Sequence, residues 1–155
     1  MKRLNPRLSE LLEHERVPYR SLPHAADITS QETAAHTHTP GREFAKTVIV
    51  KVDGEFAMLV LPAHLRVDLE KLRKWRNAAE ARLATEEEMA RLFPDCELGA
   101  EPPFGNLYEL PMYLSPLLSG DRITFHGGNH EEAVQMKFDD FLALAKPSVI
   151  DFVGY

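Results

Sequence analysis

The sequence predicts a mixed α/β fold in which a sheet carries helices on its flanks. Two observations predict this class: helical and strand-like patterns follow one another along the chain, and a β-hairpin is expected in its middle. The length of 155 residues fits one domain, large enough to bury roughly two thirds of the surface of the unfolded chain. We therefore expect residues 1–155 to form a single compact domain.

The central hairpin is the best-defined element of the sequence. Residues 44–52 and 55–61 are rich in Val, Ile, Leu and Phe, and they flank Asp53 and Gly54. An Asp-Gly pair supplies the positive φ angles of a two-residue hairpin turn. Because both faces of the first strand are largely apolar, we expect this strand to be covered on both sides and central in the sheet.

Before the hairpin, the sequence predicts a helix, a short strand and a second helix. Residues 5–15 place leucines at helical spacing, and Asn5 can cap this helix. Residues 17–22 indicate a short strand, which we place at an edge because it contains a proline. Thr29 and Glu32 have the spacing of a capping box, which predicts a short helix after Thr29.

Beyond the hairpin, helical and strand-like patterns continue to the end of the chain. Thr85 and Glu88 have capping-box spacing, and Trp75 is expected to point inward from the helix that precedes them. The predicted elements are a helix at 67–75, a strand at 81–84, a helix at 85–92, an irregular segment at 93–106, strands at 112–114, 122–125 and 133–138, and a helix at 141–145 capped by Asp139.

The charge is unevenly distributed along the chain. The net charge is −6, but residues 1–76 carry 13 Lys or Arg and 10 Asp or Glu, whereas residues 77–155 carry 5 and 14. Lys71, Arg73 and Lys74 on the helix predicted at 67–75 lie close to Arg76 directly after it, and such a run is either a solvated face or a small patch for the end of an RNA. The acidic total alone argues against a broad nucleic-acid surface.

Composition also limits the cellular setting. The chain has one cysteine, Cys96, which excludes a disulfide framework and a cysteine zinc site. No apolar run approaches the roughly 20 residues that span a bilayer, and the amino terminus lacks the apolar core of a signal peptide. We expect a cytoplasmic protein without a membrane partner.

Lys46 is the one charged residue near the start of the apolar strand. It follows Phe44 and Ala45 and precedes a run of β-branched residues. Its ammonium group either extends to the solvated edge of the sheet or faces a pocket there. Lys51, beside the turn, is expected to be solvated.

Other chemical signatures are weaker. His36 with His38, and His126 with His130, have spacings that can converge on a metal ion, but neither pair has an evident third ligand. No serine or cysteine nucleophile motif and no nucleotide fingerprint occurs. The glycine-rich loops at 99–105 and 127–130 either form turns only or expose backbone N–H groups to an anion or a developing oxyanion.

Three segments, in this order, carry a resemblance to a known family: F-A-K-T-V-I-V around Lys46, G-A-E-P-P-F-G at 99–105, and G-G-N-H at 127–130. Together they resemble the YbaK/ProX family of aminoacyl-tRNA deacylases, which is related to the editing domain of bacterial prolyl-tRNA synthetases. The similarity extends from about residue 17 to residue 147. It implies a mixed, mostly antiparallel and partly barrel-like sheet with flanking helices.

The resemblance also assigns roles to residues. It implies that Lys46 holds the phosphate and ribose end of the substrate, and that Gly105 and His130 belong to the catalytic set. Asn129 stands where one branch of the family has threonine, and Gly127 where that branch often has alanine. The implied substrate-binding residues are Gly99, Pro102, Pro103, Phe104, Gly127, Gly128 and Asn129.

The implied activity is trans-editing: hydrolysis of the ester of a mischarged tRNA, most readily a small residue such as alanine on tRNA(Pro). The partner is the 3′ end of an aminoacyl-tRNA, and a prolyl-tRNA synthetase or an elongation factor is a further partner that could supply tRNA affinity. No cofactor and no metal is implied, because an activated ester can be hydrolysed by positioned water and the ribose hydroxyl. Two alternatives stay open: a catalytically weak tRNA-end binding module or synthetase partner of the same fold, and a hydrolase of small esters.

Overall fold

Residues 3–23 and 40–154 are described by the computed structural model. The short helix predicted after Thr29, and the pair His36 and His38, lie outside these residues. None of the helices in the described ranges is long and apolar enough to cross a membrane.

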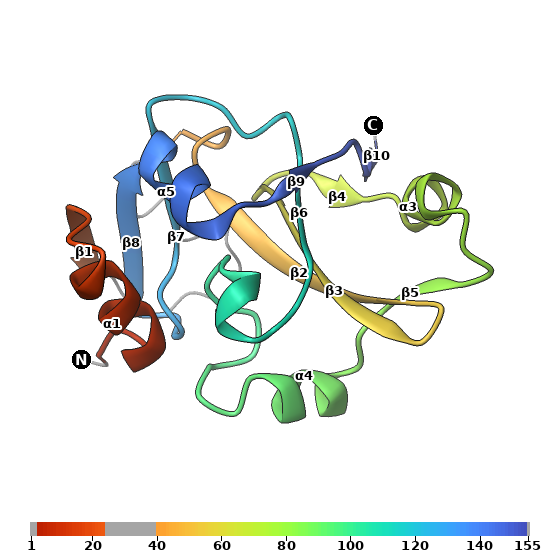
Figure 1. The fold of residues 1–155 in the computed structure, drawn as a ribbon, viewed down its shortest axis with the longest axis horizontal. Coiled ribbons are helices and arrows are strands. Elements are labelled where there is room, and N and C mark those ends of the chain that lie inside the picture. The colour runs from red at the N-terminus through yellow and green to blue at the C-terminus, as the bar shows by residue number, and fades with distance from the viewer. Residues whose placement is uncertain (1–2, 24–39, 155) are drawn as a thin grey trace.

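The predicted hairpin is confirmed and crosses the middle of the molecule (Figure 1). Its strands are β2 (Ala45–Val52) and β3 (Glu55–Pro62), which pair antiparallel over their whole length. Asp53 and Gly54 form the turn with φ angles of 47° and 84°. These left-handed values are the ones that an Asp-Gly hairpin turn adopts.

The predicted mixed α/β fold is confirmed: within the described residues the strands form three sheets, which do not close into a barrel. Five strands lie in the order β5-β2-β3-β6-β9, three in the order β1-β8-β7, and β10 pairs with β4. Among the strand pairs of the described residues, β3–β6 and β6–β9 are parallel and the others are antiparallel. The remaining strands are β1 (Tyr19–Pro23), β4 (Arg66–Val67), β5 (Ala81–Leu83), β6 (Met112–Leu114), β7 (Arg122–His126), β8 (Glu132–Lys137), β9 (Ser148–Val149) and β10 (Val153–Gly154).

Both faces of the hairpin are buried, as its apolar pattern predicts. Ala45 and Ile49 of β2 belong to an apolar cluster that also includes residues of β7 and β8 and of the helices α1 (Pro6–His14) and α5 (Phe138–Ala145). Val50 and Val52 belong to a second cluster, which includes Leu72 of the helix α3 (Leu69–Arg76). A parallel bridge between Phe44 and Thr124 joins the start of β2 to the three-stranded sheet.

Local capping rules explain where the helices begin. Asn5 accepts hydrogen bonds from two backbone N–H groups at the start of α1, and Thr85 with Glu88 forms the predicted capping box of α4. The helices are α1 (Pro6–His14), α3 (Leu69–Arg76), α4 (Glu86–Leu92) and α5 (Phe138–Ala145), with a 3₁₀ turn at Gly105–Leu107.

Two details differ from the sequence prediction. Trp75 does not point inward: it is 51% exposed and its ring makes an edge contact with Tyr113. Asp139 does not cap the last helix, because α5 begins at Phe138 and Asp139 lies in its first turn. The acidic side chain there still interacts favourably with the positive end of the helix dipole.

Candidate active site

Lys46 lies near the start of β2, opposite Leu61 of β3, and its side chain is half-buried. The pKa of Lys46 is lowered, first by burial and then by repulsion from the nearby Arg66 guanidinium. Within the described residues its ammonium group has no hydrogen-bond or ion-pair partner. Two neighbouring cations without an anion between them form a site that a phosphate group would stabilise.

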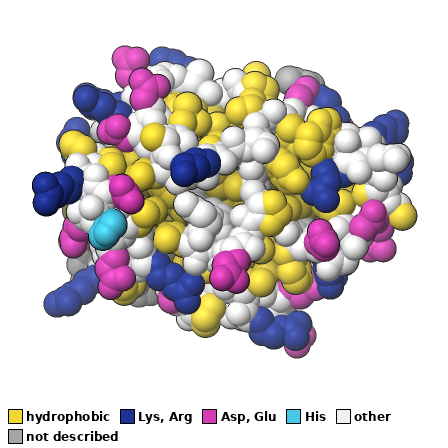
Figure 2. Space-filling model, in the orientation of Figure 1, with side chains coloured by type: hydrophobic (Ala, Val, Ile, Leu, Met, Phe, Trp, Pro, Cys, Tyr) yellow, Lys and Arg dark blue, Asp and Glu magenta, His cyan; other side chains and the backbone are white. Residues whose placement is uncertain are grey.

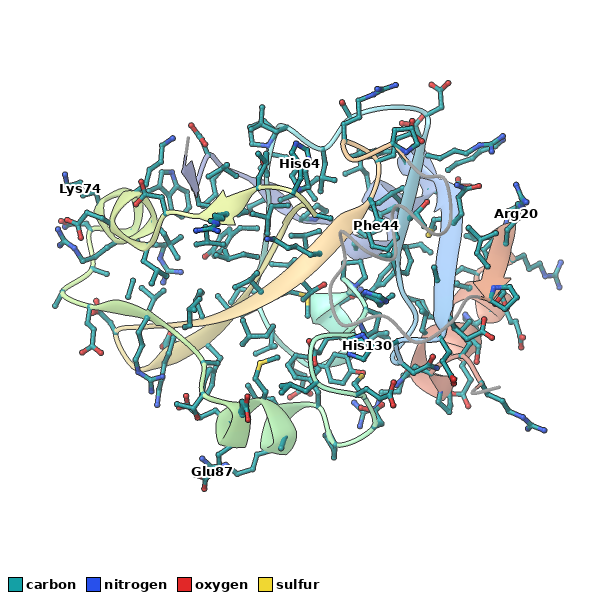
Figure 3. All side chains as sticks on the ribbon, turned by 180° about the vertical axis from the view of Figure 1, so that it is seen from behind. Arg20, Phe44, His64, Lys74, Glu87 and His130 are labelled. Carbon is teal, nitrogen blue, oxygen red and sulfur yellow. The ribbon has the colours of Figure 1, made fainter. Side chains whose placement is uncertain are left out.

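A row of aromatic rings connects the start of β2 to the turn that contains His130. The Phe44 ring lies edge-on to His126, at 5.7 Å between ring centroids, and His126 lies edge-on to His130, at 5.2 Å. Figure 3 shows Phe44 and His130 in the region between the start of β2 and the three-stranded sheet. The turn predicted to be functional therefore lies close to the strand that carries Lys46.

Backbone hydrogen bonds join the two glycine-rich loops into one unit. The N–H of Gly128 donates to the carbonyl oxygen of Ala100 (2.9 Å), and the N–H of Glu97 donates to that of Gly128 (2.8 Å). The N–H of His130 donates to Oε1 of Glu97 (2.7 Å). The structure thus brings together Gly99, Gly128 and His130, which are far apart in the sequence.

The surroundings of His130 fix the tautomer of its neutral ring. Nε2 lies 2.7 Å from the carbonyl oxygen of Leu98, and a carbonyl can only accept, so Nε2 carries the proton. Nδ1 then has a lone pair, and this buried atom has no hydrogen-bond partner in the part of the chain that the structure describes. The neutral imidazole can therefore accept a proton or a hydrogen bond at Nδ1.

Glu101 is a residue of the site that the sequence did not single out. Its side chain is 3% exposed; Oε2 accepts from the N–H of Gly99 (3.0 Å), whereas the buried Oε1 has no partner among the described residues. Burial raises the pKa of Glu101 to about 7, against the opposing effects of two backbone hydrogen bonds and of His130. The available signal was a lone acidic residue directly before Pro-Pro-Phe in an otherwise apolar stretch.

Several residues of the G-A-E-P-P-F-G loop pack inside the protein, and their predicted contacts with the substrate stay a prediction. Phe104 is fully buried and makes edge contacts with Phe125 and Phe141 in the core. Pro102 and Pro103 are buried as well. The rings of these three residues therefore anchor the loop by packing inside the protein.

Gly105 is enclosed by the protein on the side where a side chain would project, and its expected catalytic role stays a prediction. A Cβ on this residue would lie 2.6 Å from the backbone oxygen of Leu110 and 3.1 Å from Cβ of Met112. The carbonyl of Gly105 also accepts from the N–H of Leu110 (2.9 Å). Glycine is required here because the chain folds back on itself at contact distance.

Gly127, Gly128 and Asn129 contact the N-terminal segment. A Cβ on Gly127 would collide with Leu4, and one on Gly128, whose φ is +104°, would collide with Asn5. The side chain of Asn129 donates to the carbonyl of Arg3 (2.8 Å). These three residues hold the turn and the N-terminal segment together.

Metal and thiol chemistry receive no support from the described residues. No group of three or more His, Cys, Asp and Glu side chains that could hold a metal ion occurs in residues 3–23 and 40–154. Burial raises the pKa of the Cys96 thiol to about 12, and a thiol that stays protonated is a poor nucleophile.

The family of this chain is established by comparison with known proteins. Residues 23–144 match the model of the aminoacyl-tRNA editing domain, and the chain belongs to this family. The chain is 30% identical over 152 residues to the "Multifunctional Ser/Thr-tRNA deacylase ProXp-y" of Escherichia coli (strain K12), covering 94% of this chain and 90% of that relative. The resemblance read from the sequence is confirmed, and the chain is an aminoacyl-tRNA deacylase.

Two further similarities connect the chain to prolyl-tRNA synthetases. It is 35% identical over 74 residues to the "Proline--tRNA ligase" of Staphylococcus aureus (strain Newman), which covers 48% of this chain and 12% of the ligase. The crystal structure of a protein proposed as a trans-editing enzyme for prolyl tRNA synthetase superimposes with a TM-score of 0.83 at 23% identity, covering 100% of this chain and 99% of that one. The second match confirms the fold.

The packing of Gly105 predicts that Gly105→Val destabilises the protein. The valine Cβ has to displace the backbone at Leu110, and such overpacking costs about 1–3 kcal/mol. Urea unfolding measures the loss, which reports the collision alone because Gly105 is not among the glycines with a positive φ. A Gly105→Val protein of unchanged stability would contradict the packing role.

The buried carboxyl of Glu101 predicts a stability that depends on pH. The folded protein, with a pKa of about 7, keeps a proton that the unfolded chain releases near 4.5. The proton on Glu101 therefore contributes to the free energy of unfolding. This contribution is present in full below pH 4.5 and decreases by up to ~3 kcal/mol as the pH rises to about 7. Glu101→Gln should therefore raise the melting temperature at pH 8 and leave it nearly unchanged at pH 4. Equal effects at both pH values would mean that Glu101 is ionised throughout.

Proposed function

We propose that this deacylase acts in trans on a small amino acid attached to the wrong tRNA, at the site between Lys46 and His130. The observation that carries the proposal is the half-buried ammonium of Lys46 beside Arg66, which has no partner in residues 3–23 and 40–154 and lies near Phe44, whose ring contacts His126. Lys46 holds the phosphate and ribose of the terminal adenosine. The loop at 98–101 and His130 lie against the ester.

The reaction needs a positioned water molecule and a place for one proton. Water attacks the ester carbonyl carbon, the bond to the ribose oxygen breaks, and that oxygen takes up a proton as free tRNA leaves. His130 Nδ1 accepts the proton of the water, or of the neighbouring ribose hydroxyl that relays it. Because an aminoacyl ester is already activated, orientation supplies much of the rate.

The net charge of the protein and its similarity to prolyl-tRNA ligases support a particular tRNA and a partner that helps to bind it. On the face shown in Figure 2, Lys and Arg side chains alternate with Asp and Glu side chains instead of forming one basic block. With a net charge of −6, phosphate contacts alone give weak tRNA binding, so a synthetase or an elongation factor supplies part of the affinity. Similarity to prolyl-tRNA ligases supports tRNA(Pro), and alanine is the small residue expected on it.

The first test is the pair of variants Lys46→Ala and Lys51→Ala. Lys46→Ala should lower kcat/KM for deacylation by about 100-fold or more with little change in melting temperature, because its ammonium serves binding and not packing. Lys51 is the matched control: it points to the other face of β2, where it contacts Glu88 (3.4 Å) and lies over the ring of Phe56. Its loss should cost a few tenths to 1 kcal/mol of stability and leave activity intact. Loss of activity in Lys51→Ala with activity kept in Lys46→Ala would indicate that the site lies on the face of β2 that carries Lys51.

The second test is a panel of esters that differ in size. A pocket that excludes bulk sterically distinguishes one methylene by only about 1–3 kcal/mol, so alanyl, seryl and threonyl esters on tRNA should be cleaved and phenylalanyl esters spared. The rates of cleavage of alanyl-tRNA(Pro), seryl-tRNA and threonyl-tRNA show which aminoacyl group the protein prefers. Serine and threonine are included because the Escherichia coli relative is named for them. Rapid cleavage of simple methyl esters would support a small-ester hydrolase, and binding of tRNA without turnover would support a binding module.

A further inference from the structure

A shallow groove crosses the three-stranded sheet β1-β8-β7 at the end away from His126. It has a volume of about 190 Å³ and is lined by residues of all three strands, including Arg20, Arg122, Gln135 and Lys137. The three basic residues are exposed, and Figure 3 shows Arg20 at the outer edge of this sheet. The groove therefore gathers one cation from each of three strands.

The register of the sheet places these side chains on one face. Gln135 of β8 is directly opposite Arg20 of β1, and Lys137 of β8 is directly opposite Arg122 of β7. Because successive side chains of a strand alternate between the two faces, Gln135 and Lys137 share a face, as do Arg122 and His126 on β7. The cations of the groove thus lie on the face of the sheet that carries His126.

Two of the cations repel each other across the sheet. Arg122 and Lys137 are direct neighbours in the β7–β8 ladder, and like charges in this arrangement destabilise a sheet. Asp121 and Asp139 line a neighbouring hollow together with both cations, but no ion pair joins either carboxylate to them among the described residues. An anion from outside the chain would remove this repulsion.

A neutral chain of hydrogen bonds orients the Arg122 guanidinium. Its Nη1 donates to Oε1 of Gln135 (3.3 Å), and Nε2 of Gln135 donates to the hydroxyl of Thr124 (3.1 Å). Thr124 is fully buried, and its N–H donates to the carbonyl oxygen of Glu43 (2.8 Å). Because Gln135 is uncharged, it holds the guanidinium without neutralising it, and the remaining N–H groups can bind a phosphate.

The spread of the cations selects the kind of anion. Adjacent strands lie about 4.8 Å apart, so the backbones of Arg20 and Arg122, which are two strands apart, are separated by about 10 Å or more. A single small anion spans less than this distance, whereas successive phosphates of a nucleic-acid strand span it. The family of the chain acts on aminoacyl-tRNA, which supplies such a strand.

The groove also lies along the same face as the candidate hydrolytic site. Arg122 and His126 are four residues apart on β7, which corresponds to about 13 Å, and the ring of His126 contacts that of His130. A charged tRNA carries its ester on the terminal nucleotide, and its acceptor stem begins a few nucleotides before it. An ester beside His130 therefore leaves the acceptor arm within reach of the groove.

We propose that the groove formed by Arg20, Arg122 and Lys137 binds backbone phosphates of the tRNA acceptor arm while the ester lies beside His130. The position of the ester rests on the function proposed above, and the phosphate contacts do not depend on it. The groove orients the RNA and supplies a salt-dependent part of the affinity without reading a base. It is a second RNA contact, separate from the one proposed at Lys46.

The first experiment measures binding of a non-aminoacylated RNA hairpin, with an acceptor stem and a CCA end, to the whole protein by fluorescence anisotropy. Replacing Arg122 and Lys137 together by Gln should weaken binding about 10-fold and lower the slope of log Kd against log salt concentration by about 1–2. The control replaces the exposed Lys74 and Arg91 by Gln, which removes the same charge outside the groove and should change neither quantity.

Three results of this experiment would overturn the proposal. They are equal weakening in both double variants, unchanged binding in the groove variant, and no binding of the hairpin by the unaltered protein at low salt. Displacement of the hairpin by millimolar inorganic phosphate at constant ionic strength would identify a site for a small anion and exclude the RNA strand. Thermal melts of Lys137→Gln test the repulsion: the melting temperature should stay the same or rise, and a clear fall would contradict the like-charge argument.

The second experiment compares an aminoacyl-tRNA with the same amino acid esterified to the 3′ hydroxyl of adenosine 5′-phosphate, which is too short to reach the groove. The groove double variant should raise KM for the tRNA about 10-fold with kcat nearly unchanged, and should keep kcat/KM for the short ester. Equal losses on both substrates would overturn the proposal. Groove-dependent binding of the hairpin by a protein that hydrolyses no aminoacyl-tRNA would refute the proposed function and leave the groove standing.

Discussion

The burial of the β2–β3 hairpin on both faces is the constraint on which the rest of the structure depends. One face packs against α1, α5 and the three-stranded sheet, and the other packs against α3 and the C-terminal residues. Because successive side chains of β2 alternate between these clusters, the Asp53–Gly54 turn fixes which lysine faces which side. Lys46 and Lys51, an odd number of residues apart, are thereby placed on opposite faces.

That placement separates the charges of the scaffold from those of the site. Lys51 is paired with Glu88, which is also bonded to Arg82 and to the N–H of Thr85, and this network keeps the pKa of Glu88 well below its usual range. Lys46 has no such partner in the part of the chain that the structure describes, and the nearby Arg66 guanidinium makes the charged form of Lys46 less favourable. A cation kept half-buried without an anion reduces stability, and such a group persists where a ligand uses it.

Local rules account for the elements that the sequence predicted correctly. The Asp53–Gly54 turn, the Asn5 cap and the Thr85–Glu88 capping box each depend on residues within three positions of one another, so their physics is visible in a short window. The two-residue strands β4, β9 and β10 have no such signal, because they exist only through their pairing with distant strands. The exposure of Trp75 also depends on distant parts of the chain, because it is set by which segments pack against α3. The helical spacing of its own sequence does not determine it.

The structure joins the two loops that the resemblance singled out as parts of the site. Hydrogen bonds hold residues 97–101 against residues 127–130, about thirty residues further along the chain, and their role in the site stays a prediction. The roles of Gly105, Gly127 and Gly128 could not be read from the sequence, because a glycine that avoids Leu110, Leu4 or Asn5 looks the same as one that admits a ligand. Glu101 was missed for the converse reason, since an acidic residue in a loop is usually solvated.

The groups that remain unsatisfied then define the chemistry that this fold can perform. Among the described residues these groups are the ammonium of Lys46, at the start of β2, and Nδ1 of His130, in a loop that backbone hydrogen bonds hold in place. An aminoacyl-tRNA end carries phosphates and an activated ester, which are the counterparts of these groups in the roles proposed for them. An ester so activated needs orientation more than a strong nucleophile, and a protonated thiol such as Cys96 would add little. Selection among substrates therefore falls to which of these groups a given tRNA end can satisfy at once.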